Sequence, residues 1–130
     1  MRSERLRRLR RSAPTALAAL FITSGTMHLV RPTIFAGAVP AVLPARAAII
    51  ATSGIAELFC AAGLLSGARW AGAASAILLV AIFPGNLTMA LAASADPASS
   101  RRARVATWGR LPLQVPLIWA ALQARRPRNG

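Results

Sequence analysis

The chain has 130 residues, of which 55% are apolar, and a formal net charge of +13, since every Lys/Arg position is arginine and only three residues are acidic. This length favours one domain, and so high an apolar content excludes a disordered basic tail. The single cysteine, Cys60, excludes a disulfide scaffold and a cysteine-based zinc site. The function of the charge therefore depends on where the arginines lie.

Most arginines fall in three short runs, and the sequence between the runs is nearly uncharged. The runs occupy residues 1–12, 101–104 and 125–130. Between them are four apolar stretches of about the length that a membrane-spanning helix needs, roughly 17–25 residues. These stretches cover about 13–30, 46–66, 69–93 and 105–124. The sequence therefore predicts an all-α integral membrane protein, a four-helix bundle of antiparallel up-and-down topology over residues 13–124.

The basic start of the chain has two other interpretations. Residues 1–23 resemble a secretory signal peptide, but a signal needs a soluble cargo, and three further apolar stretches follow here. Nucleic-acid binding would use zinc-ligand spacing, a helix-turn-helix or interleaved aromatic and basic residues, none of which is present. We therefore expect no nucleic-acid partner, and interpret 1–12 as a basic cytoplasmic extension and 125–130 as a basic cytoplasmic tail.

The distribution of arginines also predicts the orientation. With both termini in the cytoplasm, the inner segments carry ten arginines and the outer segments five. Because positive residues favour the cytoplasmic side, we expect a multi-pass protein of the bacterial inner (plasma) membrane with cytoplasmic N- and C-termini. The run 101–104, which this places outside, argues against it. Trp70 and Trp108 lie near span ends, where aromatic side chains anchor helices.

Residues 31–45 are too apolar for a solvated loop, and their three prolines prevent one continuous helix. Pro32 suits the first turn of a short helix. We expect this segment to lie along the outer membrane surface and to cover part of the bundle.

Small residues are frequent in the apolar stretches, and small residues let helices approach closely in lipid. Gly63 and Gly67 have GxxxG spacing. This pair favours packing within the chain, while a homo-oligomer contact remains the alternative.

Each apolar stretch carries at least one polar side chain that is costly at membrane depth. At about 1.5 Å per residue, all of these positions fall in the outer half of the hydrocarbon or near its midplane. The sequence thus predicts one polar site that opens outward beneath residues 31–45. Its members are His28, Glu57, Asn86, Arg110 and Gln114.

Four of these residues have expected partners. Glu57 and Arg110 form a candidate ion pair, with a purely structural role as the alternative. Pro84 removes a hydrogen bond to the Val80 carbonyl, and Gln114 or Asn86 could serve such freed carbonyls. Asn86 and Gln114 could equally only join helices.

His28 is either a solvated helix-end residue or a ligand and proton carrier. One histidine and no cysteine pair make a metal or haem centre improbable, so we expect no metal. No cofactor is evident from the residues themselves, and Cys60 is expected to be a packing residue.

Four segments resemble the DoxX family of small four-span bacterial membrane proteins. They are SGTMHLVRPTIFAGAVPAVLP at 24–44, SGIAELFCAAGLL at 53–65, FPGNLTMA at 83–90 and RLPLQVPLIWA at 110–120. Gly85 stands where the family more often has alanine. The resemblance implies a four-helix membrane bundle whose shared polar positions are the five named above, and it assigns no catalytic residue.

The resemblance also implies a redox context. The family takes its name from a membrane subunit of an archaeal thiosulfate:quinone oxidoreductase, and other relatives are linked to redox or thiol homeostasis, so a quinone is a possible cofactor. We expect an accessory or anchor subunit, in a redox complex, whose polar site accepts a lipid- or quinone-like group. The alternative is a quinone-coupled oxidoreductase subunit in which Glu57 and His28 pass protons. A small transporter is disfavoured, because four spans without repeats leave little room for alternating access.

Overall fold

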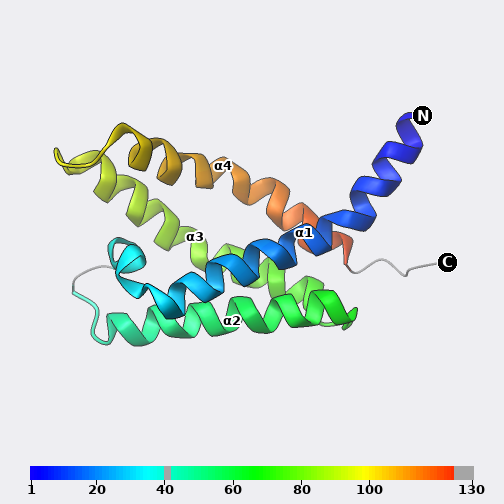
Figure 1. The fold of residues 1–130 in the computed structure, drawn as a ribbon, viewed down its shortest axis with the longest axis horizontal. Helices are drawn as coiled ribbons and strands as arrows, with labels where there is room; N and C mark the ends of the chain where they lie inside the picture. The colour runs from blue at the N-terminus through cyan, green and yellow to red at the C-terminus, as the bar shows by residue number, and fades with distance from the viewer. Residues whose placement is uncertain (40–41, 125–130) are drawn as a thin grey trace.

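The computed structural model describes residues 1–39 and 42–124, and all regular secondary structure in this part of the chain is helical. Consecutive long helices run in opposite directions along the long axis (Figure 1). The predicted all-α class is confirmed. The elements are α1 (Arg2–Val30), the 3₁₀ helix η1 (Pro32–Ala38), α2 (Arg46–Ser66), α3 (Ala71–Ala95) and α4 (Arg101–Gln123).

The residues at which the helices begin and end are explained by local capping residues. Helix α2 has the bounds expected from its apolar stretch, and it ends at Gly67, whose φ of 75° is the left-handed conformation that glycine adopts readily. Helix α4 begins earlier than expected because the Ser100 hydroxyl accepts the Ala103 N–H at 3.1 Å, an N-cap contact. Pro32 starts η1, as expected.

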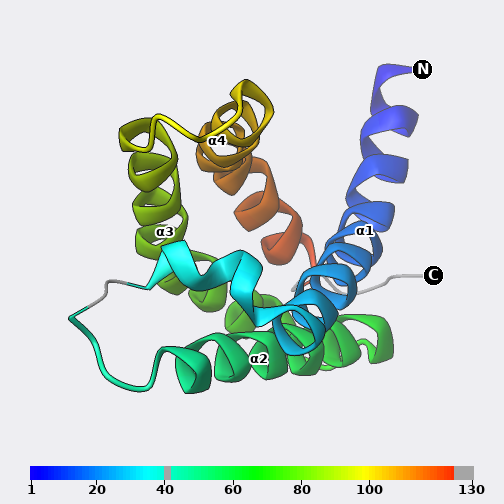
Figure 2. The same ribbon diagram turned by 60° about the vertical axis from the view of Figure 1, so that its left-hand side comes forward.

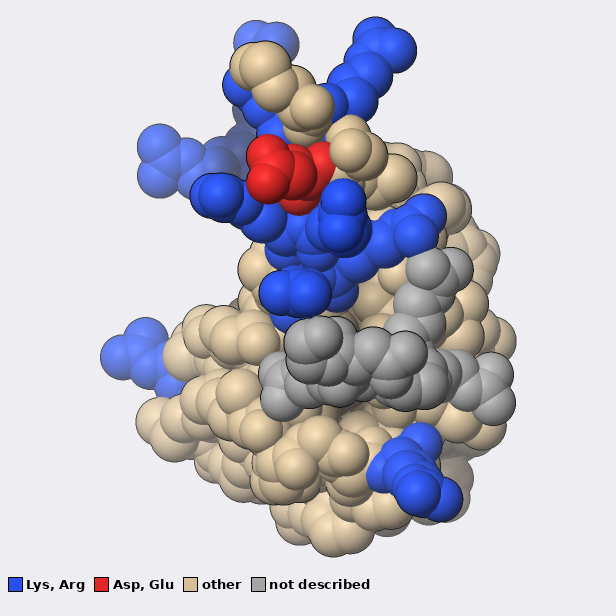
Figure 3. Space-filling model, turned by 90° about the vertical axis from the view of Figure 1, so that its right-hand side faces the viewer, with Lys and Arg blue, Asp and Glu red and all other residues tan. Residues whose placement is uncertain are grey.

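Helix α1 begins at Arg2, so residues 2–12 are helical and continuous with the first apolar stretch. Arginine and leucine are both good helix formers, whatever surrounds them. These first turns project away from the other helices (Figures 1 and 2). The end of the molecule that carries them is rich in arginine side chains, while most of the remaining described surface in this view is uncharged (Figure 3). The expected basic tail, 125–130, lies outside the described residues.

Helix α1 packs on α2, α3 packs on α4, and the two pairs meet through α1 with α4 and α2 with α3. Two apolar clusters hold this arrangement. The smaller one joins Phe35 and Val39 to Ile50 of α2, so it fixes the η1 segment over the helices. The larger one includes Leu17, Phe21, Cys60, Leu64, Leu79 and Ala121.

Of the Gly63–Gly67 pair, Gly63 packs closely within the chain, whereas a Cβ on Gly67 would meet nothing within 4 Å. A Cβ on Gly63 would lie 2.5 Å from Cη2 of Trp70, so the indole occupies the space that a side chain would need. Trp70 also stacks on Phe59, with ring centroids 4.9 Å apart. The Trp70 side chain of the same protein molecule therefore packs against Gly63.

Three helices, α1, α2 and α3, are long and apolar enough to cross a membrane, by length and composition. A fourth span was expected at about 105–124, but α4 is not among the three. It is long enough, but Arg110, Gln114 and two internal prolines lower its hydropathy.

The start of α4 is tied to the end of α3. The Arg104 guanidinium donates to the carbonyls of Ala93 (3.2 Å) and Asp96 (3.0 Å). The Trp108 indole N–H donates to the Ser94 hydroxyl at 2.7 Å. The two Arg104 bonds supply carbonyls at the end of α3 with donors that the helix itself lacks, and together with the Trp108 bond they fix the α3–α4 turn.

Candidate functional site

A cavity of about 430 Å³ lies between the four long helices and η1. Its walls are mainly apolar, and the polar side chains on them include all five that the sequence analysis grouped together. Phe35, Ala38 and Val39 of the η1 segment form part of the wall, as expected for a segment that covers the site. These five are His28, Glu57, Asn86, Arg110 and Gln114, and the hydroxyl residues Ser24 and Ser53 line the cavity as well.

The polar end of the cavity is built on a close crossing of α1 and α2. A Cβ on Gly25 would lie 2.7 Å from the Gly54 carbonyl oxygen, and a Cβ on Gly54 would lie 2.7 Å from the His28 Cβ. Only glycine leaves room for this approach. His28 follows Gly25 by three residues and Glu57 follows Gly54 by three, so the crossing brings the two side chains together.

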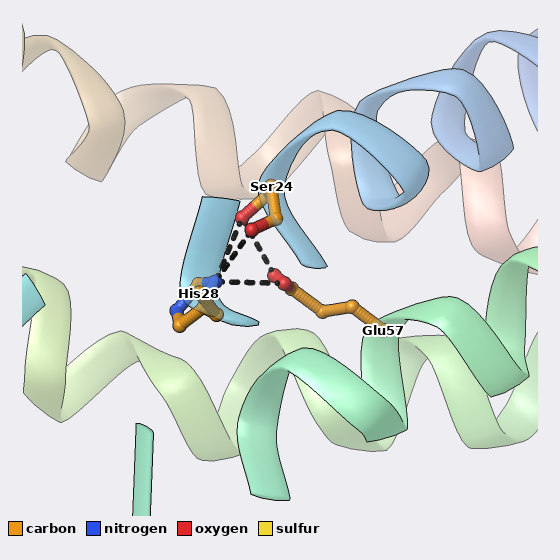
Figure 4. Close-up of polar contacts among 3 residues, drawn as sticks. All are labelled: Ser24, His28 and Glu57. Carbon is orange, nitrogen blue, oxygen red and sulfur yellow. Dashed lines mark hydrogen bonds and ion pairs between the residues drawn. The ribbon is translucent and has the colours of Figure 1, made fainter. Parts of the chain in front are cut away.

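Ser24, His28 and Glu57 form one polar cluster (Figure 4). The Ser24 hydroxyl donates to Glu57 Oε1 at 3.0 Å, and His28 Nδ1 lies 3.2 Å from Glu57 Oε2. Glu57 is only 3% exposed. A buried carboxylate needs both an ionic and a hydrogen-bonding partner, and here α1 supplies both of them.

The orientation of His28 is fixed on two sides. Nδ1 lies 2.7 Å from the Ser24 carbonyl oxygen, so this nitrogen carries the proton and donates it. The imidazole stacks on the Phe35 ring, with centroids 3.7 Å apart and planes inclined by 10°. Within residues 1–39 and 42–124, Nε2 contacts no hydrogen-bonding group of the protein, which leaves it for a molecule in the cavity.

The expected ion pair between Glu57 and Arg110 is not seen in the described residues, and Glu57 pairs with His28 instead. The reason is the order of packing. Helix α2 packs on α1 and α3, whereas α4 packs on α3 and α1, so the cavity lies between these two side chains. Arg110 lines the cavity, is exposed, and makes no ion pair within the described part of the chain.

Gln114 is buried and its side-chain N–H donates to the Leu79 carbonyl of α3. The sequence predicted that Gln114 or Asn86 would serve carbonyls freed by prolines, such as that of Val80, which follows Leu79. The Leu79 side chain is 1% exposed and packs in the larger apolar cluster, whereas the Val80 side chain is 60% exposed. Asn86 lines the cavity, and its side chain forms no hydrogen bond with the residues that the structure describes.

Sequence reasoning missed Ser24 and Phe35. The signal for Ser24 was present, because it precedes His28 by four residues and so lies on the same helix face. Phe35 had no such signal, since its position over His28 depends on how η1 folds back. Cys60 packs in the larger apolar cluster, as expected of a packing residue.

The cluster is not a serine–histidine nucleophile–base pair. The Ser24 hydroxyl donates to the Glu57 carboxylate, and His28 Nδ1 donates to the Ser24 carbonyl, so His28 is not placed to take the hydroxyl proton. Among the described residues there is also no group of three or more His, Cys, Asp or Glu that could hold a metal ion. The polar cluster can hydrogen-bond a polar group of a bound molecule, and His28 can exchange a proton with it.

The fold and the cavity define a helical protein with three helices able to cross a membrane and one internal polar site. The chain belongs to the family described as a domain of unknown function, DUF8561, which matches residues 17–125. That match begins within α1 and includes every residue that lines the cavity. No curated protein and no solved structure matches the chain.

Proposed function

We propose that the protein is a multi-pass accessory or anchor subunit of the bacterial inner membrane, with an outward-facing site for the headgroup of a lipid- or quinone-like molecule. One observation carries the proposal. Five polar side chains, drawn from four mostly apolar helices, line a single cavity of about 430 Å³. Polar residues at membrane depth that share a cavity are a functional-site hypothesis by default.

The surface of α3 supports a membrane environment. Its most apolar 18-residue window is only 11% buried, and residues such as Ile77 (69% exposed) and Val80 (60%) point outward. A helix that is apolar all round is buried in protein or in lipid. Since protein does not cover this one, lipid is the medium that fits it.

Helix α4 completes an antiparallel four-helix bundle in this proposal. Its polar residues Arg110 and Gln114 line the cavity, whereas Leu113 (54% exposed) and Val115 (73%) are on the surface. Low overall hydropathy is thus compatible with a span whose polar groups serve the site. The DoxX resemblance of the segments at 24–44, 53–65, 83–90 and 110–120 supports the same arrangement and a redox-complex partner.

Glu57→Gln tests the accessory role. Gln keeps an acceptor for Ser24 but removes the charge that pairs with His28, so the variant should insert into membranes and melt at a lower temperature in detergent. Breaking one side of a buried ion pair costs about 3–5 kcal/mol. Thr52→Val is a matched control, because Thr52 is exposed on the same helix and its hydroxyl bonds only to the Ala48 carbonyl. Equal melting of wild type and E57Q would contradict the structural role of the pair.

The His28–Glu57 pair specifically favours one other function, that of a quinone-coupled oxidoreductase subunit. In that case His28 Nε2 exchanges a proton with the bound headgroup, and Glu57 stabilises the charged imidazole. The same variant separates the two functions. If E57Q folds normally but abolishes quinone-dependent electron transfer in membranes, the accessory proposal is replaced by this one.

A further inference from the structure

The charges on the cavity wall do not balance locally. Glu57 lies against α1: its Oε1 accepts the Ser24 hydroxyl, and its Oε2 lies 3.2 Å from His28 Nδ1 without a hydrogen bond of its own. Arg110 is the other formally charged residue on the wall, and it has no ion-pair partner among the described residues. A guanidinium at membrane depth is costly unless it is paired.

The sequence has few acidic side chains that could serve as a partner. Of its three acidic residues, Glu57 is used, Glu4 lies in the projecting turns of α1, and Asp96 ends α3 at the turn. Neither Glu4 nor Asp96 lines the cavity. Among the described residues, then, no acidic side chain is placed to pair with Arg110.

The shape of the cavity indicates what kind of molecule this is. Helices α1 and α4 meet near Leu17 and Ala121 in the larger apolar cluster and stand apart further along (Figure 2). Where they stand apart, Leu20 of α1 (45% exposed) and Leu113 of α4 (54%) are both cavity walls and surface residues, as is Arg110. The cavity thus reaches the apolar surface between these helices, with a cation beside its opening.

We propose that the cavity binds an anionic amphiphile, with one carboxylate or phosphate headgroup on Arg110 and its hydrocarbon chain along Leu20, Leu113 and Leu117. This inference rests on the proposed headgroup site and specifies its ligand class. Asn86 lies free on the wall to hydrogen-bond the headgroup. Entry is sideways, from lipid, between α1 and α4.

The test uses a diazirine-bearing fatty acid as photo-cross-linking probe on the full chain in nonionic detergent, with cross-linked peptides located by mass spectrometry. Oleate, oleyl alcohol, dioleoylphosphatidylglycerol and inorganic phosphate are the competitors. We expect saturable cross-links in the segments around Leu20 and Leu113. Arg110→Gln should weaken labelling by about ten- to a hundredfold, the loss expected for a charged hydrogen bond. Arg110→Lys should restore part of it.

Arg102→Gln is the matched control, because Arg102 is an exposed arginine of the same helix that does not line the cavity. Melting temperatures of R110Q and R102Q establish that both fold. Unchanged labelling of R110Q, or oleyl alcohol competing as well as oleate, would refute the anionic ligand but leave the headgroup site standing. Competition by inorganic phosphate without competition by either lipid would mean a free anion and refute the amphiphile. Absence of any cavity label would remove the proposed site as well.

Discussion

Gly25 of α1 and Gly54 of α2 meet backbone against backbone, so closely that a Cβ on either would come within 2.9 Å of the other's carbonyl oxygen. This contact sets the position of everything at the polar end of the cavity. Three residues beyond each glycine stand His28 and Glu57, whose side chains then lie 3.2 Å apart. The ion pair is therefore a consequence of the helix crossing.

Gly54→Ala should separate α1 from α2 and disturb the ion pair. The new methyl group would lie 2.7 Å from the His28 Cβ, which cannot move without moving the helix. Overpacking of this kind costs about 1–3 kcal/mol, measured as a lower midpoint of thermal unfolding in detergent. Gly109→Ala is the control, since a Cβ there meets nothing within 4 Å. Equal midpoints for the two variants would disprove the close crossing.

Ser24→Ala should destabilise the protein through Glu57. The substitution removes the hydroxyl that donates to Oε1 and leaves a buried carboxylate oxygen unsatisfied. The expected loss is about 1–3 kcal/mol. Thr23→Ala, one position away, should have little effect, because Thr23 is exposed and its hydroxyl bonds only to the Ala19 carbonyl of its own helix. A Ser24→Ala variant as stable as Thr23→Ala would show that the hydroxyl contributes nothing.

Gln114→Leu tests the link between α4 and α3. Leucine fits an apolar wall but cannot donate to the Leu79 carbonyl. Hydrogen bonds between membrane helices contribute about 0.6 kcal/mol on average and at most about 1.7 kcal/mol, so a loss in that range is expected from unfolding in detergent. Gln123→Leu is the control, because Gln123 donates to Trp119 within its own helix. A larger loss for the control than for Gln114→Leu would contradict this role.

The sequence predicts features that depend on one helix at a time. The apolar stretch at 46–66 coincides with α2, and the helical offset from Gly25 to His28 places both on one face. The start of α1 was harder to predict from the sequence. The arginines indicated a charged segment outside the membrane, but arginine is also a good helix former, and the helix begins at Arg2. The charge of a segment indicates whether it lies in water or in lipid, but it does not determine the backbone conformation of that segment.

Contacts between helices could not be predicted in the same way. Glu57 and Arg110 were paired because their predicted depths in the membrane are similar. Similar depth does not determine which helix lies next to α2. The glycine crossing selects α1, and with it His28, as the neighbour of Glu57. The position of Phe35 over His28 depends on η1 folding back, which no periodicity in the sequence records.

The proposed orientation can be tested at two serines. In a Cys60→Ala background, which removes the chain's one cysteine from its packed position, cysteine is introduced at Ser3 or at Ser99. Ser3 lies in the arginine-rich first turns of α1, and Ser99 lies in the turn between α3 and α4. A membrane-impermeant maleimide on intact cells should label Ser99→Cys and should label Ser3→Cys only after the membrane is permeabilised.

The two positions answer different questions. Labelling of Ser3→Cys in intact cells would reverse the orientation, since the excess of arginine would then lie outside. If Ser3→Cys and Ser99→Cys were both protected, α3 and the turn that follows it would not reach the outer surface, and α1 to α3 could not be three successive spans. Protection of Ser3 alone places the α3–α4 turn outside. It also places the cavity, which lies toward η1 and that turn, in the outer half of the membrane, where a lipid headgroup can reach Arg110.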